Sequence, residues 1–328
     1  MKRLLLLALL LAAVPFAMKN QGVLYFMTLI MVLGVFAVGY DIVFGMAGLL
    51  SFGHAAFFGI GSYVFAFLVL KSPAWGLPAI GIAGVAGAIV AVAVAAIALR
   101  LAGIYFSLMT LAIAELLFYA ASSPLRGLTG GEEGLVGVPR PAFAGIDFYN
   151  EGYFYLLVLC FFVAGLAASR VLRASPLGQA MRGVKVNEIR ADQLGFNVRR
   201  IKLAAFGISG FYSGVAGALL GALMQFVNPQ GLHWSTSGDI VIMTLLGGAG
   251  TLFGPVIGVV AFEVLKEILS ARTVHFYGIV GIIFILTTLF LPTGIHGAFE
   301  SVAARWKARR AARPATPSTR SLEAGAAK

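Results

Sequence analysis

The segment SPLGQAMRGVKVNEIRADQLGFNVRRIKLAAF, residues 175–206, interrupts a chain of 328 residues that is 60% apolar and only 11% charged. Ser175 followed by Pro176 is typical of a helix N-terminus, because serine caps free N–H groups and proline is tolerated in the first turn. An apolar stripe at helical spacing follows, formed by Leu177, Met181 and Val184. The segment therefore begins with an amphipathic helix.

A second short helix is expected directly after the first. Asn187 can cap the N-terminus of EIRADQL (188–194), and Gly195 can end it in the left-handed conformation that glycine adopts without strain. Glu188 lies in the first turn, where a negative charge is favoured by the helix dipole. An ordinary connector between two apolar runs does not need two capped helices.

The rest of the chain indicates an all-α polytopic membrane protein. Its mean hydropathy is +0.94, and its charged fraction is well below the quarter or so found in soluble proteins. A β-barrel would instead show alternating segments of about ten residues. Apolar runs of about 20 residues can each cross the hydrocarbon core of a bilayer. We predict about ten spans, or eight to nine if the short runs 4–18 and 237–250 do not cross: 4–18, 22–40, 52–70, 76–99, 101–122, 153–172, 203–225, 237–250, 254–270 and 276–291.

Charge asymmetry predicts which side each loop faces. Eight of the 24 Lys and Arg residues lie in 170–202 and seven more in 305–328, whereas the loop 123–151 holds four acidic residues against two arginines. By the positive-inside rule, the loop 173–202 and both termini are cytoplasmic, and the loop 123–151 is periplasmic. Charge that is localised in this way does not indicate nucleic-acid binding.

The two ends of the chain carry different signals. The first 20 residues combine a basic start with an apolar run but lack a clear cleavage site, which favours an uncleaved first span over a signal peptide. We expect residues 1–300 to form one transmembrane domain. Residues 301–328 are basic and rich in Ala, Pro and Ser, so we expect a disordered cytoplasmic tail.

Two glycine-rich segments predict interrupted helices. The segment GMAGLLSFGHAAFFGIGSY (45–63) lies in an apolar stretch, 43–70, that would be about 42 Å long as one helix, too long for an upright crossing. We expect an unwound or re-entrant segment there, and such backbone usually lines a cavity. The segment GGAGTLFGPVIG (247–258) has a similar pattern, which indicates either an internal transporter repeat or a chance similarity.

A few polar residues within apolar runs are candidates for a translocation pathway. Glu115 is the clearest charge, and at that depth it is either functional or hydrogen-bonded within the bundle. His54 is a similar candidate, although a histidine in such a position is more often a packing residue. Gly53 and Gly250 complete the candidate set. Asp239 and Glu263 are expected at the interface, near helix ends. We expect no metal site, because the four histidines lie in separate segments and there is a single cysteine.

The sequence also allows two other function classes, an intramembrane serine protease and an ion-driven secondary transporter. The motif GISG (207–210) resembles the GxSG motif of intramembrane serine proteases, which requires a histidine within about 3 Å of Ser209. We place His275 near the opposite face and His296 outside any helix, so this interpretation is disfavoured. An ion-driven secondary transporter that uses Glu115 is the other alternative. No Walker A motif is present, so this chain does not bind ATP through a P-loop.

The order and spacing of four segments resemble the permease subunits of bacterial ABC importers for branched-chain amino acids and related compounds. The resemblance covers roughly residues 20–295, and the four segments are specific only in combination. They are GMAGLLSFGHAAFFGIGSY; GIYFSLMTLAIAELL with LTGGEEGLVGVP; the segment 175–206; and LLGGAGTLFGPVIG. The resemblance implies a permease of the type II class, similar to the vitamin B12 importer, in the bacterial inner membrane.

The same resemblance implies partners and a coupling helix. In such permeases a Glu-Ala-Ala…Gly loop docks on the ATPase, and Glu188, Ala191 and Gly195 match it, whereas Arg190 departs from its simplest form. The coupling-helix residues are then Asn187, Glu188, Ile189, Arg190, Ala191, Asp192, Leu194 and Gly195. Implied partners are two ATPases that bind ATP and Mg²⁺, a second permease and a periplasmic binding protein. This chain would carry no catalysis and no cofactor, and the substrate would be a branched-chain amino acid, urea, an amide or an aromatic acid.

Overall fold

Long apolar helices make up most of the computed structural model, which describes residues 9, 11–17, 20–72, 75–141, 148–272, 275–290 and 294–298. Among these residues, six helices are long and apolar enough to cross a membrane. They are α3 with the π-helical turn that continues it (Gln21–Met46), α4 (His54–Lys71), α5 (Gly76–Ala98), α6 (Ile104–Ser122), α8 (Glu151–Ala174) and α11 (Val198–Met224). The chain is thus an all-α polytopic membrane protein, as predicted.

Three apolar helices in the second half are shorter than these six. The helices α12 (Trp234–Gly247), α13 (Gly254–Ser270) and α14 (Phe276–Phe290) have 14, 17 and 15 residues. An upright crossing takes about 20 residues, so helix length does not confirm the predicted count of ten spans. The predicted span 237–250 is not helical over its whole length, because α12 ends at Gly247 and Gly248 is its C-cap. The predicted span 4–18 lies partly outside the described residues, and its described part includes the short helix α2 (Val14–Ala17). The tail 301–328 lies wholly outside them.

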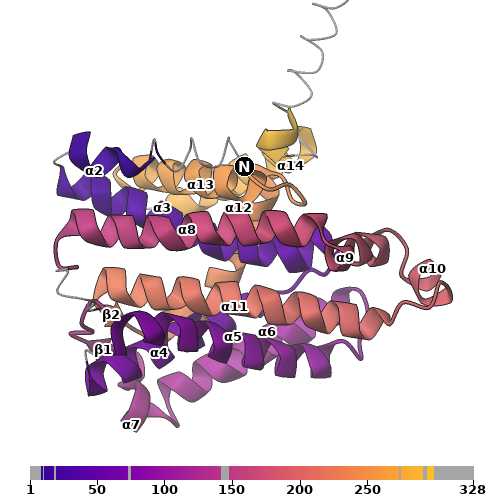
Figure 1. Cartoon of the computed structure of the whole chain (residues 1–328), viewed down its shortest axis with the longest axis horizontal. Helices are drawn as coiled ribbons and strands as arrows, with labels where there is room; N and C mark the ends of the chain where they lie inside the picture. The colour runs from indigo at the N-terminus through magenta and orange to yellow at the C-terminus, as the bar shows by residue number, and fades with distance from the viewer. Residues whose placement is uncertain are drawn as a thin grey trace, which may run out of the picture.

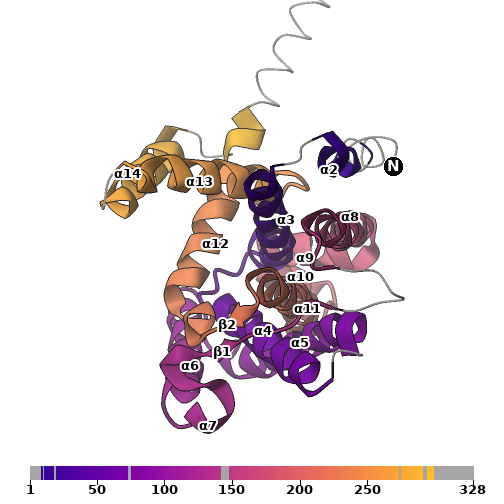
Figure 2. The same ribbon diagram turned by 90° about the vertical axis from the view of Figure 1, so that its left-hand side faces the viewer.

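Most of the long helices surround α11. Figure 1 shows α8 and α11 running along the longest axis of the molecule, with α4 and α5 packed on one side of α11 and α3 on the other. In the view turned by 90°, α8 and α11 are seen nearly end-on, whereas α12 runs across the bundle (Figure 2). The hairpin of α12 and α13 packs against α3. Because α12 is apolar but runs across the bundle, local hydropathy alone did not distinguish it from an upright crossing.

A stripe of glycines lets α11 approach its neighbours closely. A Cβ atom on Gly214 would collide with the carbonyl oxygen of Ala83 in α5, and one on Gly217 with that of Phe58 in α4. Helices associate in lipid through such small-residue contacts, because close approach increases van der Waals packing. Gly214 and Gly217 therefore serve the close packing of α11 on α5 and α4.

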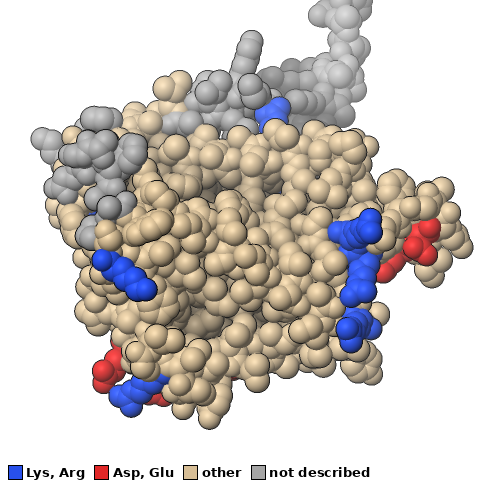
Figure 3. All heavy atoms as spheres, turned by 60° about the horizontal axis from the view of Figure 1, so that its bottom comes forward, with Lys and Arg blue, Asp and Glu red and all other residues tan. Residues whose placement is uncertain are grey.

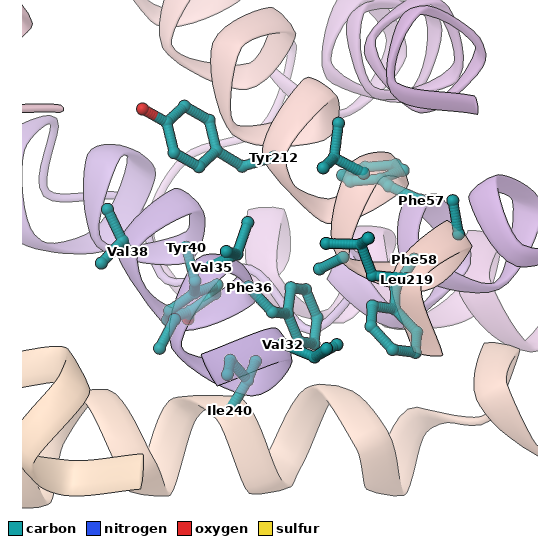
Figure 4. Close-up of a cluster of buried hydrophobic side chains, with 14 of the residues drawn as sticks. Val32, Val35, Phe36, Val38, Tyr40, Phe57, Phe58, Tyr212, Leu219 and Ile240 are labelled. Atoms are coloured by element: carbon teal, nitrogen blue, oxygen red, sulfur yellow. The ribbon is translucent and has the colours of Figure 1, made fainter. Parts of the chain in front are cut away.

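Aromatic and aliphatic side chains from four helices form the core around α3. Val32, Val35 and Phe36 of α3 point toward Phe58 of α4 and Leu219 of α11 (Figure 4). The rings of Phe36 and Phe58 are stacked, with their centroids 4.7 Å apart. Offset aromatic pairs of this kind add to the packing energy and hold α3 against α4.

The two ends of the bundle carry different loops. At one end lie α7 (Arg126–Thr129), the 3₁₀ turns η3 (Gly131–Glu133) and η4 (Pro229–Leu232), and an antiparallel ribbon of β1 (Leu135–Val136) and β2 (Phe226–Val227). We call this the ribbon end. At the other end, the coupling end, α9 (Pro176–Val186) and α10 (Glu188–Gln193) project from the bundle (Figure 1). On the face in Figure 3, most charged residues gather at the two ends. Apart from one basic patch at the upper edge, the surface between them is uncharged, as a lipid-facing belt requires.

Candidate functional site

The N-terminal caps predicted for the two short helices at the coupling end are confirmed. The Ser175 hydroxyl accepts the backbone N–H of Gly178, and Pro176 occupies the first turn of α9. The Asn187 side chain accepts the N–H of Arg190 over 2.9 Å and so caps α10. Each cap satisfies a backbone donor that a helix N-terminus leaves free, which keeps these short helices formed.

The C-terminus of α10 is closed by the predicted glycine. Gly195 has a φ angle of 86°, and its N–H donates to the carbonyl of Asp192 over 2.9 Å. The N–H of Phe196 donates to the carbonyl of Ala191 over 3.2 Å. These two bonds form a Schellman motif, which needs a left-handed residue at the position of Gly195. A helix of only six residues is thus fixed at both ends.

The surface of α10 is suited to protein binding. Ala191 faces the bundle and is buried, whereas Ile189 and Leu194 are 72% and 70% exposed. A groove of about 590 Å³ lies between α9 and α10 beside Leu194. The Glu188 carboxylate pairs with the Lys202 ammonium of α11 over 2.6 Å, and this pair ties α10 to the bundle.

Both glycine-rich segments interrupt helices, as predicted. Helix α3 continues into the π-helical turn η1 (Ile42–Met46), residues 47–53 are not helical, and α4 begins at His54. In the same way α12 ends at Gly247 and α13 begins at Gly254. We call residues 42–53, the π-helical turn and the non-helical stretch after it, the first break, and residues 248–253 the second break. The breaks approach each other, because a Cβ atom on Gly45 would collide with the backbone nitrogen of Gly250.

A buried carboxylate that sequence reasoning missed joins the two breaks. Asp41 at the end of α3 is fully buried and accepts the backbone N–H of Gly250 over 2.7 Å. It also forms an ion pair with Arg173, whose guanidinium donates to the Gly250 carbonyl over 2.8 Å. The signal was present in the segment VGYDIVFG, since an acid inside an apolar run indicates function by default. Hydropathy drew attention to Glu115 instead, because that residue lies deeper within its apolar run.

The candidate residues His54 and Gly53 lie at the start of α4. Gly53 packs against the backbone of Thr110 in α6, whose hydroxyl accepts the N–H of Phe52 over 3.1 Å. The His54 ring is fully buried, with Nδ1 3.1 Å from the Ser51 hydroxyl and Nε2 2.9 Å from the Ser209 hydroxyl. His54 therefore connects the first break to α11.

Glu115 lies apart from the breaks. Its Oε1 atom accepts the backbone N–H of Trp234, the first residue of α12, over 2.9 Å. The side chain is half-buried, and it satisfies a donor at a helix N-terminus. Glu115 thus holds the start of α12 against α6. Gly53 lies in the first break with His54 directly after it, and Gly250 lies in the second break. Among the described residues no group of three or more His, Cys, Asp or Glu side chains is arranged to hold a metal ion.

A family model described as "Branched-chain amino acid transport system / permease component" matches residues 22–288. The chain belongs to this family. As a member it is a permease subunit of an ABC importer and a multi-pass protein of the inner membrane. The matched region includes both breaks, α9, α10 and Asp41.

Individual relatives agree with this assignment. The high-affinity branched-chain amino acid transport system permease protein LivM of Escherichia coli (strain K12) is 30% identical over 322 residues, which cover 90% of this permease and 75% of LivM. LivH of the same organism is 27% identical over 280 residues, which cover 80% of this permease and 91% of LivH. The ribose import permease protein RbsC of Haemophilus influenzae is 26% identical over 112 residues, which cover 33% of this permease and 35% of RbsC. No solved structure matches the permease.

Two expectations about polar residues of this permease are corrected. No histidine was expected beside Ser209, but His54 Nε2 lies 2.9 Å from its hydroxyl, because the long-range packing of α4 on α11 brings the two residues together. Both side chains are fully buried, and the His54 ring packs against the rings of Tyr40 and Phe206, so the pair is a packing contact inside the bundle.

The second correction concerns the acids expected near helix ends. Glu263 lies in the middle of α13 and is only 5% exposed. Together with Asp239 and Lys266 it lines a cavity of about 170 Å³ beside α3 and α12. The packing of α13 against α12 brings these residues together, which the sequence positions alone did not reveal.

Proposed function

We propose that this permease forms half of the membrane path for branched-chain amino acids or related small compounds, driven by partner ATPases that dock on α10. The observation that carries the proposal is α10 itself, a helix of six residues capped at both ends. Isolated helices of this length do not persist in water, so the caps indicate that the shape is required. Its exposed Ile189 and Leu194 offer an apolar anchor for a groove on the ATPase.

The sidedness of the proposal follows from charge. The coupling end holds eight of the 24 Lys and Arg residues in 170–202, and the cytoplasmic side of membrane proteins is enriched in these residues. The ribbon end, with the loop 123–151, is then periplasmic and is where a substrate-binding protein would deliver its cargo. Both chain termini and the basic tail 301–328 are placed in the cytoplasm.

The substrate class is taken from the relatives. LivM and LivH are named for branched-chain amino acid transport, and similarity to LivM extends over 90% of this chain. More distant relatives are named for import of ribose and autoinducer 2, so the family accepts different small molecules. Branched-chain amino acids are therefore the first candidates, ahead of urea, short amides and aromatic acids.

The assembly is proposed to contain two permeases and two ATPases. Similarity to both LivM and LivH supports a pair of homologous permeases, and we propose a heterodimer. ATP and Mg²⁺ would bind to the ATPases, and this chain would carry no catalytic residue. The fold proposed is the type II class of the vitamin B12 importer with about ten crossings, in which α12, α13 and α14 complete the membrane domain.

Purification of the permease with its natural partners tests the assembly. A tagged chain expressed from its own genomic context should retain an ATPase and a second permease after detergent extraction. Isolation of the chain alone, together with uptake that needs only an ion gradient, would support the secondary-transporter alternative instead.

A further inference from the structure

We infer that Asp41 is the positioning residue through which movement of α9 and α10 reaches the two broken helices. The inference deepens the proposed function, since it rests on α10 being the ATPase contact. Asp41 lies where α3 passes into the first break, and its two bonds reach the second break and the end of α8. One buried carboxylate thus holds three elements that adjoin both the breaks and the coupling end.

Arg173 is the link on the α8 side. It lies in the last turn of α8, three residues before α9 begins at Pro176. One guanidinium nitrogen pairs with the Asp41 carboxylate, and the other donates to the Gly250 carbonyl over 2.8 Å. Because an arginine side chain presents its donors in a fixed plane, a tilt of the α8–α9 corner changes both bonds together.

A second contact connects α9 itself to the first break. The ammonium of Lys185, in the last turn of α9, donates to the Gly45 carbonyl over 2.8 Å. The Lys185 side chain also packs against Gly48, whose φ angle is 75°. Asn187, the cap of α10, follows two residues later. Displacement of α10 therefore pulls on the first break through Lys185 and on the second break through Arg173.

The burial of Asp41 makes this junction sensitive to its partners. A buried carboxylate is tolerated when it is paired and hydrogen-bonded, and removal of one partner leaves an uncompensated charge. A shift that withdraws Arg173 from Asp41 therefore disfavours the present arrangement of the breaks. The breaks are the parts that can respond, because non-helical, glycine-rich backbone absorbs the dihedral changes of hinge motion.

The test compares three variants in vesicles that contain the whole complex. Asp41→Asn keeps an acceptor for the Gly250 N–H and removes the charge. Arg173→Lys keeps the charge beside Asp41 but has no second planar donor for the Gly250 carbonyl. Arg170→Lys, on an exposed position of the same helix, is the matched control.

The readout is the number of substrate molecules imported per ATP hydrolysed. We expect this ratio to fall at least tenfold in Asp41→Asn and severalfold in Arg173→Lys, with ATP hydrolysis retained and Arg170→Lys unchanged. A wild-type ratio in Asp41→Asn overturns the inference. If the complex with Asp41→Asn does not assemble, the Arg173→Lys variant provides the test. A wild-type ratio of import to ATP hydrolysis in that variant also overturns the inference. Absence of ATP-dependent uptake in the wild-type complex would instead contradict the proposed function.

Discussion

The backbone N–H of Gly250 donates to the carboxylate of Asp41 over 2.7 Å, so the two glycine-rich breaks of the chain meet at one buried acid. The two residues are 209 positions apart in the sequence. Arg173 completes the contact from the corner that leads into α9 and α10. In this arrangement the proposed ATPase contact and the interrupted helices belong to one connected network.

Reversal of the charge at Glu188 should uncouple ATP hydrolysis from uptake. Glu188→Lys places a positive charge in the first turn of α10, against the positive end of the helix dipole, and next to Lys202. We expect the variant to insert and to bind the periplasmic protein normally, while substrate-stimulated ATPase activity is lost. Wild-type stimulation of the ATPase by substrate would count against a role for Glu188 in coupling.

Replacement of Gly195 by valine tests the shape of α10 without changing its charge. A β-branched residue is strained at the φ angle of 86°, so the Schellman motif should be destabilised by about 1 kcal/mol or more. The ATPase should dissociate more readily, as measured by its retention during purification. The control is Gly81→Ala on the exposed face of α5, away from α9 and α10, where an added Cβ meets no atom within 4 Å. Equal retention in the two variants would show that the C-terminus of α10 is not part of the contact.

The role of Glu115 is separated by two substitutions. Glu115→Gln keeps an acceptor for the Trp234 N–H and removes the charge, and we expect lower uptake without dissociation of the complex. Glu115→Leu also removes the acceptor for the Trp234 N–H at the start of α12. Because the loss of a capping hydrogen bond costs about 1 kcal/mol, the melting temperature of the Leu variant should fall below that of the Gln variant. Normal uptake in Glu115→Gln would leave this residue with the structural role alone.

The topology is tested by labelling with an impermeant thiol reagent in intact cells. In a background with Cys160→Ala, a cysteine at exposed Glu133 of the ribbon end should react, and one at exposed Arg182 of α9 should not. Membrane permeabilisation should then expose the second site. Labelling of the Arg182 position from outside would invert the proposed sidedness of every loop.

Local patterns predicted local structure well. The caps at Ser175 and Asn187 and the glycine end at Gly195 involve residues at most a few positions apart, so the sequence contains all that determines them. The interruption near residue 50 was also predictable, because a single apolar helix of that length does not fit a bilayer.

Contacts between distant segments were not predictable in the same way. The pairing of Asp41 with Arg173 and of His54 with Ser209 spans 132 and 155 positions, and no spacing rule connects such residues. Hydropathy likewise does not distinguish an upright crossing from α12, which is apolar but only 14 residues long and lies across the bundle. The packing of α3 on α8 brings Asp41 to Arg173, and the packing of α4 on α11 brings His54 to Ser209. Both arise only in the folded chain.

ATP-driven import coupled through α10 is tested most directly by uptake of labelled leucine into vesicles that contain the purified complex of this permease with its partners. The binding protein is supplied outside and ATP is enclosed inside. We predict uptake that requires hydrolysable ATP and the binding protein. Glu188→Lys should abolish this uptake, and Gly81→Ala should preserve it. Leucine uptake by this chain without ATPase subunits, or full ATP-driven uptake in Glu188→Lys, would contradict coupling through α10.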